Sequence, residues 1–499
     1  MELSADVVVI GSGAGGAPVA AALAEAGRSV VVLEAGPRLE TKDFTGDEEE
    51  MTARLWKIGA AGRVLTLYAG ACVGGSTVIN DALCFRPPGR LLEVWQDYYD
   101  LPGLGAEGME PYVNRVWEDI HAEPTGPDHT SRNAARLALG AQRLGWMASA
   151  TPRSVRNCVN LGLCNFGCPS GAKQSTLVTY VPRAERAGAL VLARTRAERI
   201  RIEAGGVTGV DAVQLDPTTG EPGERVAIDA PLVCVAAGVM ATPALLLRSG
   251  VPGVTGEGVA VHSSTHVVAR FAEPVNGYYG PSMGFAVTEF ATLLGPTGPG
   301  VMIENTGTHP IGTAAVIPGI GAEHAARIAQ LPYLAKALVL VRDSARGHAA
   351  ADGTISYVHH ADDMARLRLG MSEAARAYLA AGAEEVWLPL HGFPAVRRPR
   401  DLVALDKRPL DASSFTLLYA VHLFGGAAMG RQGPCDDEGH CGGVRGLYVT
   451  DASGLPTSTG VNPQVTIMAN ALAMRSAFAM MVTCGLTPVL VGRPEASVT

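Results

Sequence analysis

The stretch that decides the fold is ADVVVIGSGAGGAPVAAALAEAGRSVVVLE, which spans residues 5–34. The apolar run Ala5–Ile10 is typical of a buried parallel strand. A glycine-rich turn follows it, and then an alanine-rich segment predicts a helix that ends near Gly27. A second apolar strand, Ser29–Leu33, leads directly into Glu34. This order predicts a right-handed βαβ unit and therefore a parallel sheet.

The glycines of the turn have the spacing of a dinucleotide-binding loop. Gly11, Gly13 and Gly16 form the pattern G-x-G-x-x-G between the strand and the helix. In such a loop the first glycine makes the turn, the second admits the pyrophosphate and the third lets helix and strand pack closely. Glu34 follows about 20 residues later, where a carboxylate can bind ribose hydroxyls. The pattern predicts a dinucleotide site but does not separate NAD from FAD.

Length and composition exclude several classes of protein. A chain of 499 residues needs more than one domain, and its net charge of −8 without a Lys/Arg run argues against nucleic acid as a partner. No stretch of 18 or more apolar residues predicts a membrane span, and the first strand begins too early for a signal peptide. We therefore expect a cytoplasmic protein whose nine cysteines are reduced thiols or ligands.

The order of elements predicts one discontinuous domain with another inserted into it. The glycine-rich first and last parts of the chain are expected to fold together as a cofactor domain, with the middle as a second domain. The predicted boundaries are residues 1–90, 155–262 and 415–499 for the cofactor domain, 91–154 for a peripheral helical segment and 263–414 for a substrate domain. A helix is expected near 362–381 and a long apolar helix over 465–482.

Further motifs follow in a recognisable order along nearly the whole chain. They are the loop Gly74-Gly75-Ser76-Thr77-Val78-Ile79-Asn80, the stretch VAAGVMATP at 235–243, HLFGGAAMG at 422–430, GLYVTDAS at 446–453 and Val461-Asn462-Pro463. Together with the opening βαβ unit, these motifs resemble those of the glucose–methanol–choline (GMC) family of flavoprotein oxidoreductases, closest to the branch of long-chain alcohol oxidases. The resemblance implies an α/β fold: a discontinuous Rossmann-like FAD-binding domain plus a smaller substrate domain with an antiparallel sheet.

The resemblance also implies FAD as the cofactor and assigns its contacts. The implied cofactor-binding residues are Gly11, Gly13, Ala14, Gly15, Gly16, Glu34, Ala35, Gly75, Ser76, Asn80, Ala82, Arg199, Ala237, Asp451, Ala452 and Pro463. Arg199 stands where the family usually has a valine that contacts adenine through its backbone, so the role of its side chain stays open. Some family members tether FAD through a histidine at the position of Ile79, so the flavin is expected to be non-covalent here.

The catalytic residues implied by the resemblance are His422 and Asn462. His422 matches the family's catalytic histidine, and Asn462 matches the second member of the pair, which is histidine or asparagine. A neutral imidazole can take the hydroxyl proton of an alcohol while hydride leaves its carbon for flavin N5. Asn462 can bind the same oxygen. Asn462 and Pro463 also precede the apolar helix, whose N-terminus would stabilise negative charge on the reduced flavin.

Two further groups of residues leave alternatives open. Cys158, Cys164 and Cys168 resemble both the alcohol-oxidase branch and dehydrogenase subunits that carry an iron–sulfur cluster. A structural loop with reduced thiols is favoured over a cluster, because a fourth nearby cysteine is missing. His262 and His266 would share one side of a strand or helix, but no third ligand is visible, so a structural role is favoured and no metal site is assigned.

The predicted activity is oxidation of an alcohol to an aldehyde or ketone, with oxygen or an external electron acceptor. The cysteine loop and the apolar middle domain favour a lipophilic alcohol of the fatty, terpenoid or steroid type. Two alternatives stay open. One is an electron-transfer dehydrogenase subunit that acts on a sugar derivative, and the other is a flavin-containing lyase of the same fold. The intact pair His422 and Asn462 argues against a non-catalytic flavin scaffold.

Overall fold

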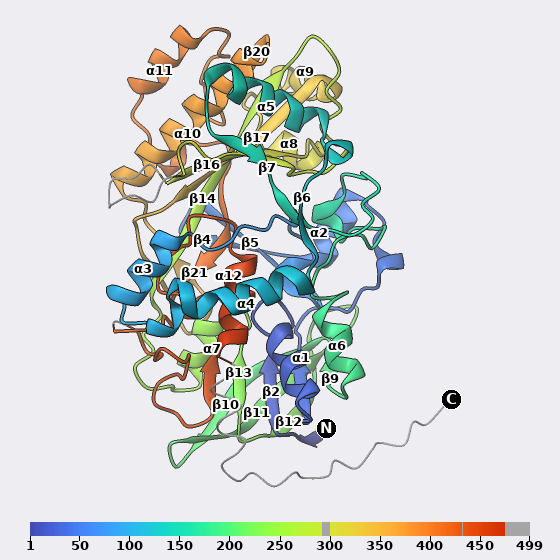
Figure 1. The fold of residues 1–499 in the computed structure, drawn as a ribbon, viewed down its shortest axis with the longest axis vertical. Coiled ribbons are helices and arrows are strands. Elements are labelled where there is room, and N and C mark those ends of the chain that lie inside the picture. The colour runs from blue at the N-terminus through green and yellow to red at the C-terminus, as the bar shows by residue number, and fades with distance from the viewer. Residues whose placement is uncertain (292–299, 432, 475–499) are drawn as a thin grey trace.

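The computed structural model describes residues 1–291, 300–431 and 433–474. Its architecture is mixed α/β, which confirms the predicted fold class. Figure 1 shows a parallel sheet toward the lower end of the molecule and a large mixed sheet toward the upper end. Segments from both ends of the chain and from its middle meet between these two sheets.

The lower sheet is the predicted parallel sheet. It has five strands in the order β22-β13-β2-β3-β9, and every neighbouring pair is parallel. Its strands are β2 (Val7–Ile10), β3 (Val30–Leu33), β9 (Leu190–Leu192), β13 (Val233–Val235) and β22 (Leu447–Val449). The first three are short apolar runs, and β2, β3, β13 and β22 are buried throughout, as expected of strands covered on both faces.

A second, four-stranded sheet lies beside the parallel one. Its order is β1-β12-β11-β10, with antiparallel pairs except for β1 against β12. The strands are β1 (Glu2–Ser4), β10 (Thr195–Glu203), β11 (Gly206–Leu215) and β12 (Pro222–Asp229). Helix α1 (Ala17–Glu25) begins directly after the glycine-rich turn and packs against α6 (Tyr180–Arg186).

The upper sheet has eleven strands and is largely antiparallel. Its main path is β18-β19-β4-β5-β21-β14-β17-β16-β15-β7, and β20 pairs with β14. The strands are β4 (Trp56–Ala61), β5 (Leu65–Gly70), β7 (Ala148–Ala150), β14 (Glu257–Arg270), β15 (Phe285–Val287), β16 (Val301–Thr306), β17 (Leu334–Arg342), β18 (Gly347–Ala349), β19 (Ile355–Ser356), β20 (Glu385–Trp387) and β21 (Leu418–Phe424). The sheet thus joins strands from the predicted cofactor segments to strands from the middle of the chain.

Helices pack on the upper sheet, and one of them, α8, contacts β14 beside Val268. Helix α10 packs on β14, β16 and β17, and α5 packs on α10. The α-helices other than α1 and α6 are α2 (Glu48–Leu55), α3 (Gly89–Asp97), α4 (Ala106–Asp119), α5 (Arg132–Leu144), α7 (Thr242–Arg248), α8 (Pro310–Val316), α9 (Ala322–Ile328), α10 (Ala361–Ala380), α11 (Val403–Asp406) and α12 (Gln464–Ala473). Figure 1 shows α4 crossing the middle of the molecule, where it packs on α12.

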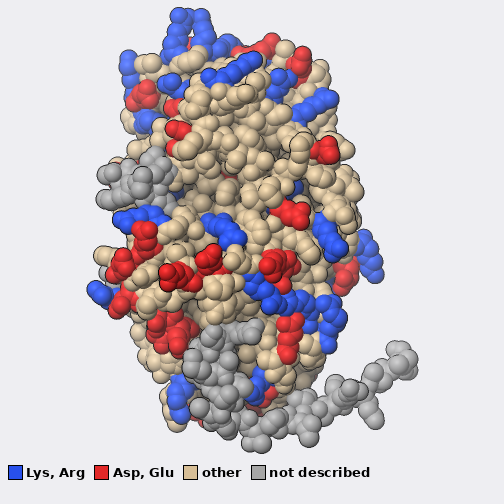
Figure 2. All heavy atoms as spheres, viewed as in Figure 1, with Lys and Arg blue, Asp and Glu red and all other residues tan. Residues whose placement is uncertain are grey.

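Most predicted elements form close to their expected positions. The long helix expected near 362–381 is α10, and the first strand, helix and second strand are β2, α1 and β3. The predicted final helix is α12 as far as Ala473, and its remaining predicted part, from 475, lies outside the described residues. Among the described helices, none is both long and apolar enough to cross a bilayer. Figure 2 shows acidic and basic side chains interspersed on one face.

Candidate active site

The glycines of the first glycine-rich loop differ in how much space surrounds the position of a missing Cβ atom. A Cβ on Gly16 would overlap the carbonyl of Gly11, and a Cβ on Gly15 would lie 2.6 Å from the carbonyl oxygen of Thr450. Gly13 differs, because its Cβ would meet only the Cα of Gly75, at 3.7 Å. Packing therefore requires glycine at 15 and 16, whereas at Gly13 the missing side chain leaves room for a ligand.

The second glycine-rich loop lies directly against the first. Gly75 has a positive φ of 52°, and a Cβ there would lie 2.9 Å from Gly13. Ser12 joins the two loops: its hydroxyl accepts from the N–H of Gly74 at 2.9 Å and donates to Glu34 at 2.6 Å. The two predicted loops therefore form one glycine-lined cradle.

Glu34 lies at the carboxyl end of β3, as the motif predicts. Its carboxylate accepts hydrogen bonds from Ser12 and from the N–H of Gly36 at 2.9 Å. Burial raises the pKa of Glu34, and these hydrogen bonds act in the opposite direction. The carboxylate is thus held at the edge of the cradle, where a ribose would lie.

The closing part of the chain returns to the same cradle. The carboxylate of Asp451 accepts from the N–H of Gly238 at 2.7 Å and from the hydroxyl of Thr242 at 2.6 Å. It also accepts from the N–H of Ser453. Gly238 and Thr242 belong to the third predicted motif, so Asp451 joins that motif to the last strand. Four separated motifs therefore surround one site at the carboxyl ends of the parallel strands, where dinucleotides bind in this class of sheet.

The start of α12 faces the second loop. The side-chain amide of Asn80 donates to Gln464 at the first turn of α12, and its oxygen accepts from the N–H of Ala82 at 3.0 Å. Ala82 has a positive φ of 62°, which is unusual for a residue with a Cβ. Pro463 is the N-cap residue of the helix. The helix N-terminus is therefore fixed beside the cradle.

His422 lies on β21 and faces the neighbouring strand β14. Its Nδ1 lies 3.2 Å from Nδ1 of His262, and the two rings are perpendicular. His262 in turn accepts a hydrogen bond at Nε2 from the N–H of Gly460, at 2.9 Å. Gly460 and Asn462 belong to the same loop, so His262 connects His422 to the segment that carries Asn462. Because Nε2 of neutral His262 accepts, its Nδ1 carries the hydrogen and donates to Nδ1 of His422 in this arrangement. Nε2 of His422 lies outside the contact, and it can take a substrate proton in the tautomer whose hydrogen is on Nδ1.

The surroundings favour neutral imidazoles in this pair. Burial lowers the pKa of His422 to about 4, even though part of the ring remains accessible. Burial, and then the neighbouring His422 and Arg342, lower the pKa of His262. A neutral His422 is the form that can take a proton from an alcohol.

Asn462 lies close to a carboxyl group that the sequence did not predict. Glu304, on β16, is fully buried. Burial raises its pKa to about 8, although the nearby Asn462 amide acts in the opposite direction. Neither carboxyl oxygen of Glu304, nor Oδ1 of Asn462, completes a hydrogen bond of normal geometry among the described residues. Buried polar atoms without partners are rare in native interiors, so this group is a candidate for binding a ligand.

Apolar side chains surround the remaining part of this region. One buried cluster is separate from the main core, and Val421 and Val461, the neighbours of His422 and Asn462, pack against it. Its members are Leu83, Met283, Ala286, Met302, Leu338, Leu340 and Tyr419. The polar groups of the site thus adjoin an apolar surface.

Comparison with known proteins places these features in a family. The N-terminal profile of the GMC oxidoreductases matches residues 5–264, and the C-terminal profile matches residues 340–471. An uncharacterised GMC-type oxidoreductase of Mycobacterium tuberculosis is 35% identical over 485 residues, which cover 94% of this chain and 75% of the relative. The chain belongs to the GMC oxidoreductase family.

Other relatives have named activities. The long-chain-alcohol oxidase FAO4B of Arabidopsis thaliana is 27% identical, covering 95% of this GMC oxidoreductase and 67% of the plant enzyme. Among solved structures, pyridoxine 4-oxidase from Mesorbium loti superposes with a TM-score of 0.70 at 16% identity, over 95% of this chain and 99% of that one. The structural likeness shows the fold alone. Membership of the GMC oxidoreductase family confirms the predicted family and the predicted enzyme class, an FAD-dependent oxidoreductase that acts on CH–OH groups.

The cysteine loop of this GMC oxidoreductase braces the second glycine-rich loop. Lys173, which is buried, donates from Nζ to the carbonyls of Val78, Asn80 and Cys164 at 2.5–2.8 Å. Cys164 lies 3.1 Å from a guanidinium nitrogen of Arg153. In the part of the chain that the structure describes, no three His, Cys, Asp or Glu side chains could hold a metal ion. The contacts give the loop a direct structural task beside the cofactor cradle.

The other predicted cofactor residues lie on or near the cradle, and their contacts with FAD stay predictions. Ala14, Ala237 and Ala452 belong to the loops already described, and Ala35 follows Glu34 on the surface. The side chain of Arg199 is exposed on β10, beside a bulge between Ala197 and Arg199. Ile79 is buried.

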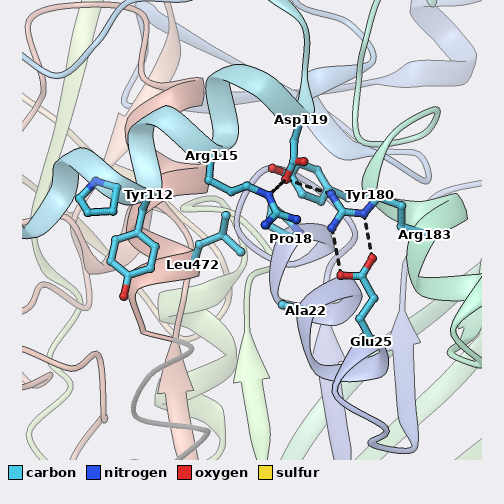
Figure 3. Close-up of a pocket in the computed structure, with 10 residues that line it drawn as sticks. Pro18, Ala22, Glu25, Tyr112, Arg115, Asp119, Tyr180, Arg183 and Leu472 are labelled. Atoms are coloured by element: carbon cyan, nitrogen blue, oxygen red, sulfur yellow. Dashed lines mark hydrogen bonds and ion pairs between the residues drawn. The ribbon is translucent and has the colours of Figure 1, made fainter.

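A separate surface pocket lies between α1, α4, α6 and α12 (Figure 3). Its wall carries a chain of ion pairs: Arg183 binds Glu25 and Asp119, and Arg115 binds Asp119. It contains none of the predicted site residues. The ion pairs join helices of the cofactor half, so the pocket has a structural explanation.

Proposed function

We propose that this GMC oxidoreductase oxidises a lipophilic alcohol of the fatty, terpenoid or steroid type, with His422 as the base. The observation that carries the proposal is the position of His422 and Asn462 beside the separate apolar cluster. Buried apolar surface favours an alcohol with a hydrocarbon body over a sugar, whose hydroxyls would lose their hydrogen bonds there. Relatives named as long-chain-alcohol oxidases and as a cholesterol oxidase support this choice.

The proposed chemistry divides the two hydrogens of the carbinol. His422 takes the hydroxyl proton, and the carbon–oxygen double bond forms as hydride leaves the carbon. When bound, FAD supplies the hydride acceptor. Asn462 holds the oxygen in place by donating from its side-chain amide nitrogen. Glu304 is protonated at neutral pH because of its raised pKa, so no carboxylate charge opposes the forming carbonyl.

The cofactor is proposed to bind without a covalent bond. Ile79, at the position where some relatives carry a tethering histidine, has no nucleophilic atom and its side chain is buried. The cradle of Gly13 and Gly75 would hold the pyrophosphate, and Glu34 would hold the ribose. FAD should therefore appear in the supernatant after acid precipitation of the protein.

The test is an anaerobic screen of alcohols for bleaching of the oxidised flavin, followed by admission of air. We expect long-chain, terpenoid or steroid alcohols to bleach the flavin and sugars not to do so. Re-oxidation by air with formation of peroxide would identify an oxidase, and bleaching without re-oxidation would identify a dehydrogenase with another acceptor. A flavin that no alcohol bleaches, in a protein that cleaves a substrate without redox change, would identify the lyase alternative.

A further inference from the structure

One face of the upper sheet changes in chemical character along its strands. Residues paired directly across an antiparallel sheet share a face, and every second residue along a strand stays on it. On this face Arg342 pairs with His262, which pairs with His422. Two residues further along β17, Leu340 pairs with Met302 on one side and with Ser264, the row's polar member, on the other. The row beside the catalytic pair is thus followed by an apolar row.

The next two rows on the same face become polar again. Leu338 pairs with His266 and with Glu304, and Lys336 pairs with Val268 and Thr306. Same-face rows are about 7 Å apart, so the Lys336 row lies about 20 Å along the strand from the row of His262 and His422, a gap that the length of the Lys336 side chain can reduce. A chain of apolar side chains connects the rows, because Leu338, Leu340, Met302 and Tyr419 all belong to one cluster.

Lys336 is a largely buried cation for which the described residues provide no partner. Only 5% of its surface is exposed, and among the described residues its Nζ has no hydrogen bond or ion pair. The Nζ atom is not among the fully buried unpaired atoms, so it keeps some accessible surface that a ligand can reach. An ammonium group with so little solvent around it is stabilised by an anion that binds it. Burial lowers its pKa to about 8, while Glu48 and Asp81 act in the opposite direction.

The two carboxylates that act on Lys336 are both occupied elsewhere. Asp81 accepts from the hydroxyl of Ser282 and from the amide of Asn165. Glu48 accepts from the N–H groups of Ile311 and Gly312, at the start of α8. They reduce the electrostatic penalty of Lys336 from a distance, but they leave its ammonium group available for a further anion.

Other unpaired polar atoms lie around the same end of the face. Burial, and then Lys336, lower the pKa values of both His266 and His309, so these histidines are neutral beside the ammonium group. Nε2 of His309 and the hydroxyls of Thr308 and Thr313 are buried without partners among the described residues. A native interior rarely leaves so many polar atoms unpaired in one region, which points to a ligand that is bound there in use.

We propose that Lys336 binds a carboxylate at the far end of the substrate, whose carbinol lies at His422 and Asn462. The substrate is then an amphipathic hydroxy acid, with an apolar body along the Leu338 and Leu340 rows. This inference rests on the proposed function and narrows it. Glu304, neutral at physiological pH, stands between the two ends and does not repel the carboxylate.

The experiment compares 10-hydroxydecanoate with decan-1-ol, which have the same chain length. A hydrogen bond between the carboxylate and the Lys336 ammonium should raise kcat/KM for the hydroxy acid by about tenfold to a hundredfold over the alcohol. The difference should come mainly from a lower KM. Lys336→Met should remove this preference and leave the rate with decan-1-ol and the FAD content unchanged. Lys57→Met, which removes one exposed positive charge on β4, is the matched control and should keep the preference.

Two further measurements keep the inference testable if Lys336→Met is unstable. Decanoate, which lacks the hydroxyl, should perturb the flavin spectrum of the wild-type protein and compete with decan-1-ol, whereas acetate should do neither. In a Glu304→Gln background, where the charge at position 304 does not change, the preference for the hydroxy acid should also decline above pH 8, because the lowered pKa of Lys336 makes its ammonium lose its proton there.

Some outcomes would overturn only this inference, and others would reach the proposed function. Flavin bleaching by decan-1-ol with no advantage for 10-hydroxydecanoate, or an advantage that survives in Lys336→Met, overturns the carboxylate site alone. Failure of every alcohol to bleach the flavin overturns the proposed function. Decanoate binding that depends on Lys336 would still support the site in that case, because it requires no turnover.

Discussion

The proposed cofactor cradle and the proposed substrate face of this enzyme are built on different principles. The cofactor cradle uses backbone: glycines at 11, 13, 15, 16 and 75 bring main chain close together or leave space for a ligand. The substrate face uses side chains that alternate along β14, β16, β17 and β21. Backbone recognition needs fixed spacing within a short segment, whereas side-chain recognition is assembled from segments far apart in the sequence.

This difference predicts which property a substitution in each region should change. In the cradle, a single added methyl group should decide whether the cofactor binds, because main-chain atoms cannot move aside easily. On the substrate face, a changed side chain should alter rate, preference or pH dependence while the cofactor stays bound. The predictions below test this division, beginning with the variant expected to have the largest effect.

The cradle prediction contrasts Gly13→Ala with Gly16→Ala. The Cβ of Gly13→Ala meets protein only at 3.7 Å, so the apoprotein should keep its thermal stability. The methyl group would occupy the space of the pyrophosphate, and loss of two charge-assisted hydrogen bonds would weaken FAD binding by roughly 10²–10⁴-fold. Fluorimetric FAD titration and thermal melting measure the two effects.

Gly16→Ala should affect the stability of the apoprotein more than its affinity for FAD. Its Cβ overlaps Gly11, so the apoprotein itself should lose stability. Gly89→Ala, where a Cβ meets no atom within 4 Å, is the control that should change neither property. Normal FAD affinity in Gly13→Ala would refute the idea that this glycine admits the cofactor.

On the substrate face, His422→Ala should have the largest effect on rate. A general base contributes roughly 10²–10⁴-fold, so the rate of anaerobic flavin reduction by an alcohol should fall by that factor or more. FAD should stay bound, because the cradle residues lie on other loops. Stopped-flow measurement of flavin bleaching tests the rate, and the visible spectrum reports the bound flavin. A near wild-type rate would require another base.

Asn462→Ala should cost less than His422→Ala. The variant removes one orienting hydrogen bond and leaves the base in place, so we expect a loss of about tenfold. Asn462→Asp is a useful comparison, because it keeps the size of the side chain but places a charge beside Glu304. If Asn462→Ala lost as much activity as His422→Ala, Asn462 would have a larger role than positioning.

The sequence predicts the cradle well because the information is local. The spacing of Gly11, Gly13 and Gly16 specifies a turn and a helix start within one segment, and β2, α1 and β3 form as expected. The resemblance to a family extended this to Asp451 and the start of α12. Even so, contacts such as Ser12 with Gly74, which join two loops, became visible only in the structure.

The substrate face could not be predicted in the same way. The sequence interpretation gave His262 a structural role, yet the structure places it against His422. Glu304 and Lys336 were not singled out at all, because a single Glu or Lys in a strand carries no motif. Their importance depends on which strands pair and in what register, and β14 pairs with β17 and β21, which lie more than 60 residues away in sequence.

The smallest predicted effect concerns pH, and it separates two groups on the substrate face. His422 accepts a proton only when it is neutral, and its pKa is lowered to about 4. The rate of flavin reduction should therefore rise as pH increases through about 4 and be nearly constant between about pH 6 and 7.

Glu304, with a pKa raised to about 8, is neutral over that range and becomes charged above it. Its negative charge beside Asn462 should then change the rate by a small factor, because the developing carbonyl and the substrate oxygen lie next to it. Glu304→Gln should remove the change near pH 8 and leave the rise near pH 4 intact, and stopped-flow rates from pH 3.5 to pH 9 would measure both. If Glu304→Gln shifted the rise near pH 4 instead, the ionisation that limits the rate would belong to Glu304 and not to His422, and the assignment of the base on this face would have to be reversed.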